Sequence, residues 1–154
     1  MTPVPFSEPP YLSGLPSPYY SDSHRLWQQK CRSFIGEHLL PYAFEWEEEG
    51  TVPEHVYKTF ADAGMLVPSL PAPLPVERLD SLGITDILGI PTRDFDYFHT
   101  MIHNDEMCRS GLMGPSGSLT VGFAYGIPPL IKFGSKELQD RVLPDLLPDE
   151  KGYV

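Results

Sequence analysis

His99 and His103 have the spacing that most directly suggests chemistry. Two histidines four residues apart on a helix present both imidazoles on one face, as a zinc site requires, and Asp105 and Glu106 follow closely. The pair lacks the glutamate that lies between the histidines of zinc-protease helices, and the sequence offers no clear third ligand. The alternative is a pair of packed or solvated histidines, and we assign no metal ligand on this pattern.

The segment Gly114-Pro115-Ser116-Gly117-Ser118 raises two other possibilities. A phosphate-binding loop would follow a strand and end in Lys and Ser or Thr, and this segment has neither feature. Ser116 as a nucleophile would need a Gly-x-Ser-x-Gly setting and an assignable histidine partner, and both are missing. The sequence therefore predicts no catalytic residue and no cofactor-binding residue.

The elements that must position these side chains are helical. Pro41 is placed to interrupt the first helix, Gly64 to end the second in a left-handed conformation, and Ser135 to cap the last. No strand and no internal repeat is predicted, so the fold class is all-α, a helical bundle-like domain. Helical patterns cover five stretches of the chain: residues 22–42, 53–63, 94–110, 115–125 and 136–146.

Two proline-rich segments separate or precede these helices. Residues 1–20 are predicted to form an extended arm that lies on the surface or on a partner. Residues 65–93 are predicted to form a long, mostly extended connector, which is uncommon in a compact domain unless it is functional or packs on another domain. The helical domain itself is placed at residues 21–150.

Composition and charge exclude several functions. A chain of 154 residues is enough for one domain. The formal charge of −10, with 11 scattered Lys and Arg residues, argues against binding to nucleic acids and to anionic membranes. Cys31 and Cys108 have no Cys-x-x-Cys spacing, so neither a disulfide framework nor a structural zinc site is expected. The N-terminus shows no secretory or import signal, and we expect a cytoplasmic location, with the peroxisome and the mitochondrion left open.

The most informative pattern lies near the C-terminus. Gly134 closes one element, the next helix carries Gln139 in its second turn, and Leu143-Pro144 follows near its end. This segment resembles the Gly-x-x-x-x-Gln…Leu-Pro segment that closes the N-terminal helical domain of acyl-CoA dehydrogenases. The connector is longer than usual in that family and lacks its Gly-Gly pair, which suggests a divergent branch similar to fungal cytosolic members. Other matches follow in the family's order: Leu40-Pro41 with Trp46-Glu47 through Gly50, Pro53 through Gly64-Met65, and Asp105-Glu106 through Ser110.

The resemblance implies an FAD-dependent oxidoreductase that acts on the CH–CH group of an acyl thioester. In the family the flavin site and the catalytic base lie in later domains. We therefore expect this chain alone neither to bind FAD nor to catalyse. Residues 151–154 correspond to the start of the middle β domain, so we expect a chain truncated before that domain.

The same resemblance implies which residues contact the substrate. Counting back from the corner expected at Gly126-Ile127-Pro128, the family's acyl-pocket wall corresponds to Gly117, Ser118, Val121 and Tyr125. The alternative is that this face packs in the core. Implied partners are an acyl-CoA or related acyl substrate in the intact enzyme, and a homo-oligomer or a full-length relative. A second hypothesis is a non-enzymatic helical module that pairs with such a relative.

Overall fold

The computed structural model describes residues 8, 10 and 15–146. Most of the predicted arm and the predicted start of a further domain at residues 151–154 lie outside the described residues. The elements in chain order are α1 (Asp22–His38), α2 (Ala43–Glu49), α3 (Glu54–Asp62), the 3₁₀ helix η2 (Val67–Ser69), α4 (Val76–Ser81), β1 (Asp86–Ile87), β2 (Ile90–Pro91), the 3₁₀ helix η3 (Thr92–Asp94), α5 (Tyr97–Met107), the 3₁₀ helix η4 (Cys108–Ser110), α6 (Met113–Val121), the π-helix η5 (Gly122–Gly126), α7 (Ile127–Phe133) and α8 (Lys136–Leu146).

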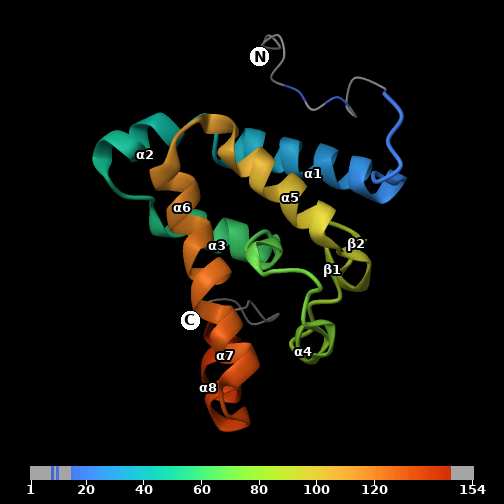
Figure 1. Ribbon diagram of the computed structural model, residues 1–154. Helices are drawn as coiled ribbons and strands as arrows, with labels where there is room; N and C mark the ends of the chain where they lie inside the picture. The colour runs from blue at the N-terminus through green and yellow to red at the C-terminus, as the bar shows by residue number, and fades with distance from the viewer. Residues whose placement is uncertain (1–7, 9, 11–14, 147–154) are drawn as a thin grey trace.

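The central packing is between α1 and α5, which lie side by side across the top of the molecule in Figure 1. Trp27, Cys31 and Ile35 form the buried face of α1, and Ile102 and Met107 are buried on α5. The α6–η5–α7 run descends along one side, where α8 packs against α7. This arrangement confirms the predicted all-α, bundle-like class. No helix in the described part of the chain is long and apolar enough to cross a membrane.

The predicted helix ends are also found. The chain turns at Pro41 between α1 and α2, and Gly64 ends α3 with φ of 69°. The amide of Gly64 donates to the Ala61 carbonyl and that of Met65 to the Phe60 carbonyl, both at 2.8 Å, which is the Schellman pattern. At the start of α8, Ser135 Oγ accepts a hydrogen bond from the Leu138 amide at 3.2 Å.

The expectation that residues 65–93 are extended is wrong. This segment contains η2, α4 and a short antiparallel hairpin, in which Ile87 pairs with Ile90. Leu88 and Gly89 form its two-residue turn, both with positive φ, as a type I′ turn requires. The segment is structured because its prolines alternate with apolar residues that enter the core. These buried residues are Met65, Leu66, Val67, Leu70, Leu74, Leu79, Ile87 and Ile90.

The corner expected at Gly126-Ile127-Pro128 is also absent, because the chain continues helically from α6 into α7. The Ile127 amide bonds to the Gly122 carbonyl five residues back, which defines the π turn. Pro128 and Pro129 explain this widening, since neither has an N–H and each ring would clash with the carbonyl four residues before it in a regular helix. The real corner is at Gly134, the C-cap of α7.

Candidate functional site

The predicted wall residues lie along one helical run, on α6 and η5. Gly117 is half-buried, and a Cβ built on it would lie 3.9 Å from Cγ2 of Val121, so these two positions are neighbours on the helix surface. The side chains of Val121 and Tyr125 are 51% and 75% exposed. Packing in the core of this chain therefore does not explain either residue.

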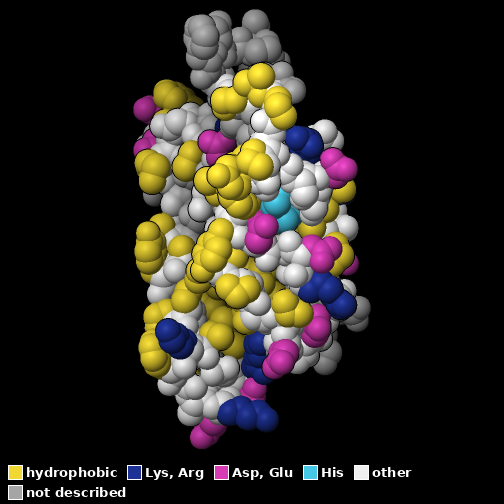
Figure 2. Space-filling model, turned by 45° about the vertical axis from the view of Figure 1, so that its right-hand side comes forward, with side chains coloured by type: hydrophobic (Ala, Val, Ile, Leu, Met, Phe, Trp, Pro, Cys, Tyr) yellow, Lys and Arg dark blue, Asp and Glu magenta, His cyan; other side chains and the backbone are white. Residues whose placement is uncertain are grey.

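Ser118 faces a neighbouring helix. It is exposed and lines a groove of about 270 Å³ between α2 and α6, together with Trp46, Gly114 and Pro115. Hydrophobic side chains gather on the left and centre of the face in Figure 2, whereas charged side chains lie mainly along its right edge and lower end. This face of the molecule therefore exposes a large apolar surface.

Glu47 on α2 fixes the start of α6. Its Oε2 accepts a hydrogen bond from the Gly114 amide at 3.0 Å. The residue preceding α6, Leu112, contributes no side-chain cap of its own. A carboxylate at this position satisfies one of the amides that have no intrahelical partner and complements the positive end of the helix dipole.

The described residues do not fit FAD, which the resemblance implies for the intact enzyme. The glycine-rich segment that begins at Gly114 lies inside α6, and the Gly114 amide already bonds to the Glu47 carboxylate, which would repel a phosphate. The strands β1 and β2 have two residues each and pair as a hairpin, so neither leads into the glycine-rich turn and helix that bind a dinucleotide. Ser116 is buried and its Oγ donates to the Leu112 carbonyl at 3.1 Å, so it is not placed as a nucleophile either.

His99 and His103 do not act as a pair. His103 is fully buried, its ring stacked near Trp27 with centroids 6.5 Å apart, and neither ring nitrogen makes a well-formed hydrogen bond within the described residues. Burial lowers the pKa of His103 to about 4, an effect that the nearby Met65 backbone and Asn104 side chain only partly offset. His103 is a neutral core histidine.

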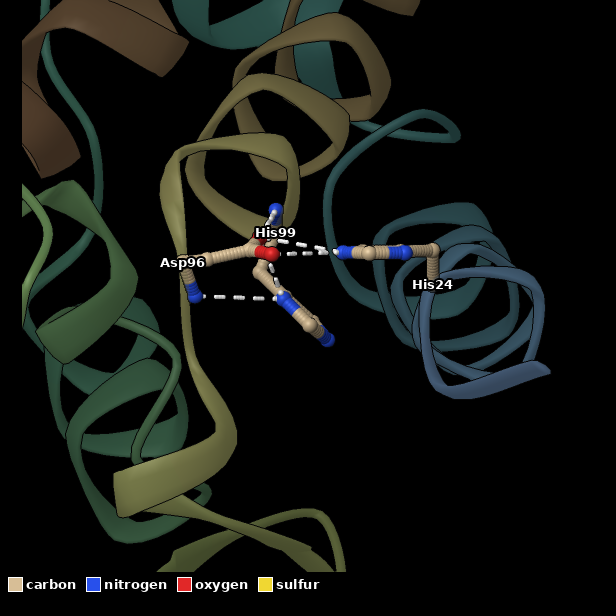
Figure 3. Close-up of side chains that lie close together, drawn as sticks. All are labelled: His24, Asp96 and His99. Carbon is tan, nitrogen blue, oxygen red and sulfur yellow. Dashed lines mark hydrogen bonds and ion pairs between the residues drawn. The ribbon is translucent and has the colours of Figure 1, made fainter. Parts of the chain in front are cut away.

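His99 instead joins His24 and Asp96, a cluster that sequence analysis missed (Figure 3). Nε2 of His24 lies 3.0 Å from Oδ1 of Asp96, and Nδ1 of His99 lies 2.9 Å from the same oxygen. Ser23 Oγ lies 3.0 Å from the other His99 nitrogen. The available sequence signal was a repeated capping-box spacing, with a cap at Ser21 or Asp96 and a histidine three residues later in each case.

Asp96 is the charged centre of this cluster. It also caps α5, since Oδ1 accepts from the amides of Phe98 at 2.9 Å and His99 at 3.2 Å. Burial alone would raise the pKa of Asp96, but its contacts with the His24 and His99 rings and the hydrogen bond from the His99 amide outweigh burial and lower the pKa to about 2. Burial lowers the pKa of His99, which keeps that ring neutral at physiological pH.

The donor arrangement fits hydrogen bonding better than metal binding. The Ser21 amide donates to Nδ1 of His24 at 2.8 Å, so Nδ1 must offer its lone pair and the ring proton must lie on Nε2. A metal would need the lone pair of that same Nε2, which points at Asp96. We therefore describe His24, Asp96 and His99 as the α1–α5 junction, in which the Asp96 carboxylate accepts a hydrogen bond from Nε2 of His24 and the Asp96 amide donates to Nδ1 of His99 at 3.3 Å.

A second buried cluster links the same two helices. The buried carboxylate of Glu106 accepts from Gln28 Nε2 at 2.8 Å and from Arg32 Nη2 at 2.7 Å. Glu8 of the N-terminal arm receives two hydrogen bonds from Arg32, at 2.8 and 3.0 Å, and one from Arg109 at 3.1 Å. At this residue the arm lies on the chain's own helices.

Comparison with known proteins identifies a family for this chain. The model of the family "Acyl-CoA dehydrogenase, N-terminal domain" matches residues 21–150. Acyl-CoA dehydrogenase apdG of Emericella nidulans is 64% identical over 148 residues, which cover 96% of this chain and 34% of that protein. Acyl-CoA dehydrogenase AFT10-1 of Alternaria alternata is 30% identical over 150 residues, covering 97% of this chain and 34% of that protein. The mitochondrial short-chain specific acyl-CoA dehydrogenase of Sus scrofa is 25% identical over 120 residues, covering 78% of this chain and 25% of that protein.

The chain spans about a third of the length of these fungal relatives, with 34% of each covered. No solved structure matches it. The predicted resemblance is confirmed by the family match over residues 21–150 and by the two fungal relatives. The chain therefore belongs to the acyl-CoA dehydrogenase family, whose N-terminal domain it carries.

Proposed function

We propose that this chain forms one wall of the acyl pocket of an acyl-CoA dehydrogenase-type flavoenzyme. The substrate is an acyl-CoA or a related acyl thioester, and FAD and the catalytic base come from parts of the enzyme outside this chain. The chain by itself neither binds FAD nor catalyses. Free Cys31 and Cys108 suit a reducing compartment, and the cytoplasm is the location we propose.

The observation that carries this proposal is the exposure of Val121 and Tyr125 on a helical run whose other side is buried. Leu119 and Ile127 on the same run are 1% and 3% exposed. Apolar side chains gain roughly 25 cal/mol for each Å² removed from water, so an exposed apolar stripe favours an apolar neighbour. An acyl chain, together with the domains that enclose it, supplies such a neighbour.

The residues of this wall have distinct tasks. Gly117 has no side chain, so the acyl chain can approach the backbone there. Val121 and Tyr125 supply apolar contact and exclude water. The size of Tyr125 limits how deep an acyl chain reaches, and one methylene in an apolar pocket is worth about 1–3 kcal/mol of discrimination.

The test joins all 154 residues of this chain to the part of the Emericella relative that lies beyond the matched region; we call this protein the extended chain. We expect the extended chain to be yellow and to oxidise acyl-CoA, and the 154-residue chain to be colourless and inactive. A stoichiometric flavin absorbance band in the 154-residue chain would contradict the proposal. So would an extended chain that binds flavin but oxidises no acyl thioester.

A second candidate function is pairing in trans with a full-length relative. The exposed apolar stripe continues to Phe133, which is 79% exposed on α7, and such a surface also suits a protein partner. Mixing this chain with the full-length Emericella relative and following co-elution tests this possibility. Co-elution that is lost when Val121 and Phe133 are both changed to Ser would support it, and separate elution of the two unaltered proteins would exclude it.

A further inference from the structure

We propose that Glu47 is a positioning residue for the acyl-pocket wall. From α2 it fixes the N-terminal end of α6, and so determines how far Val121 and Tyr125 project toward the acyl chain. This inference rests on the proposed function, because it concerns the same wall. It also gives a reason for the charge of Glu47 in the last turn of α2, where a carboxylate opposes that helix's own dipole.

The contact between the two helices is specific. Glu47 Oε2 and the Gly114 amide lie 3.0 Å apart although the residues are 67 positions apart in the chain. Because Leu112 provides no side-chain cap, the carboxylate acts where a helix would otherwise use its own N-cap residue. The helix dipole strengthens this charge-assisted bond.

The absence of a side chain at Gly114 leaves room for the Glu47 carboxylate. A Cβ at position 114 would lie 2.5 Å from Oε2 of Glu47 and 3.2 Å from its Cδ. An alanine there would push the carboxylate away from the amide. By contrast, a Cβ on Gly36, which lies in α1, would meet nothing within 4 Å.

The contact also lies on the wall side of α6. Ser118 is one turn beyond Gly114 on the same helical face, and both line the α2–α6 groove with Trp46 and Glu47. Val121 lies almost one further turn along. A small tilt at the first turn of α6 therefore moves Val121 at the other end of the same helix, and with it Tyr125 in the π turn that continues the helix.

Glu47 is exposed, which separates a positioning task from a folding task. An exposed charge contributes little to global stability. A displacement of a pocket wall by 1 Å or less, however, changes substrate discrimination by large factors. The expected signature is an altered chain-length preference with little change in melting temperature.

The experiment uses the extended chain and measures kcat/KM for a series of straight-chain acyl-CoA substrates. Glu47→Ala and Gly114→Ala should each change the ratio between neighbouring chain lengths by about 3- to 10-fold in the same direction. The double variant should change it no more than either single variant, because both remove one contact. Glu47→Gln keeps an acceptor oxygen and should stay near the parent ratio, as should the matched control Glu48→Ala on the same helix.

An unchanged ratio in Glu47→Ala would overturn the proposal, as would a uniform fall at all chain lengths together with a lower melting temperature. Amide exchange in the 154-residue chain provides an independent check, since Gly114 should exchange faster in Glu47→Ala than in Glu48→Ala. Tyr125→Ala distinguishes a failure of the proposed pocket wall from a failure of the positioning role of Glu47. If it leaves the ratio fixed, the proposed function fails and this inference fails with it; if it changes the ratio while Glu47→Ala does not, only the positioning role of Glu47 fails.

Discussion

The carboxylate of Glu106 on α5 lies 2.7 Å from Nη2 of Arg32 on α1, and the Glu106 side chain is almost fully shielded from water. Gln28 donates to the same carboxylate from one turn earlier on α1. Because a buried carboxylate is costly unless it is paired, this contact fixes the relative position of α1 and α5. The 3₁₀ helix η2 also packs against α5.

Replacing Glu106 with Ala should lower the free energy of unfolding by about 2–4 kcal/mol. The change removes the acceptor of the buried Gln28 amide and one of the two carboxylates that pair with Arg32, and it opens a cavity. The lower bound reflects the partial exposure of Arg32 and its remaining pair with Glu8. Urea unfolding measures the loss. Glu37→Ala, at an exposed position on α1, should stay within about 0.5 kcal/mol. Equal stabilities for the two variants would contradict this assignment.

If the α1–α5 junction is a hydrogen-bonded cluster, replacing Asp96 should lower the stability of the chain, and zinc should have no effect on it. Asp96→Ala should cost about 1–2 kcal/mol, because it removes the side-chain N-cap of α5 and the acceptor of the His24 ring. The nearby exposed Asp94 has neither role among the described contacts, and Asp94→Ala should be close to neutral. Zinc should not raise the melting temperature of the parent chain. A saturable, equimolar stabilisation by zinc that disappears in Asp96→Ala would show that the junction is a metal site.

The buried His103 should lower the free energy of unfolding of the chain as the pH falls. Burial lowers the pKa of His103 to about 4 in the folded chain, whereas its pKa is near 6.5 in the unfolded chain. Between these two pH values the unfolded chain binds a proton at His103 and the folded chain does not. Stability from this group is complete above pH 6.5 and falls by about 2–3 kcal/mol as the pH drops toward 4.

His103→Leu should remove this part of the pH dependence and be close to neutral at pH 7.5, because no well-formed hydrogen bond is lost. His55→Gln, at an exposed position, should leave the dependence unchanged. Urea unfolding at pH 7.5, 6 and 4.5 compares the three chains. A parent and a His103→Leu variant with the same pH profile would refute the assignment.

The two thiols should differ in reactivity. Burial raises the pKa of the Cys31 thiol, with a further contribution from the Glu106 charge, whereas Cys108 is exposed. A thiol reagent at pH 8 should therefore label one cysteine in the native chain and two in denaturant. Cys108→Ser should abolish native labelling. Rapid labelling of Cys31 under native conditions would mean that the α1 face is more open than described.

Local chemistry made the helix ends predictable, and tertiary packing decided the rest. Gly64 and Ser135 work within a few residues of themselves, so their effect can be inferred from the sequence. The burial of Leu74 and Leu79 in the proline-rich segment depends on what packs against them. Proline composition alone gave the wrong expectation of an extended backbone there.

The polar clusters could not be predicted from local sequence either, because their members are far apart in the chain. His24 and Asp96 are 72 residues apart, and only the fold reveals that their capping boxes meet. The carboxylate of Glu47 has no partner within its own helix, because it bonds to the Gly114 amide in the first turn of α6. The four wall positions were placed by family resemblance, and their helical spacing alone would have fitted a core face equally well.

The measurement that tests the central claim most directly is the chain-length profile of the Tyr125→Ala extended chain. Removing an exposed ring should leave the melting temperature nearly unchanged and extend the preferred acyl chain by one or more carbons. Tyr97→Ala, which removes a ring of similar exposure from α5, should leave the profile as it was. A Tyr125→Ala profile that coincides with those of the parent and of Tyr97→Ala would contradict the claim that this helix lines the acyl pocket.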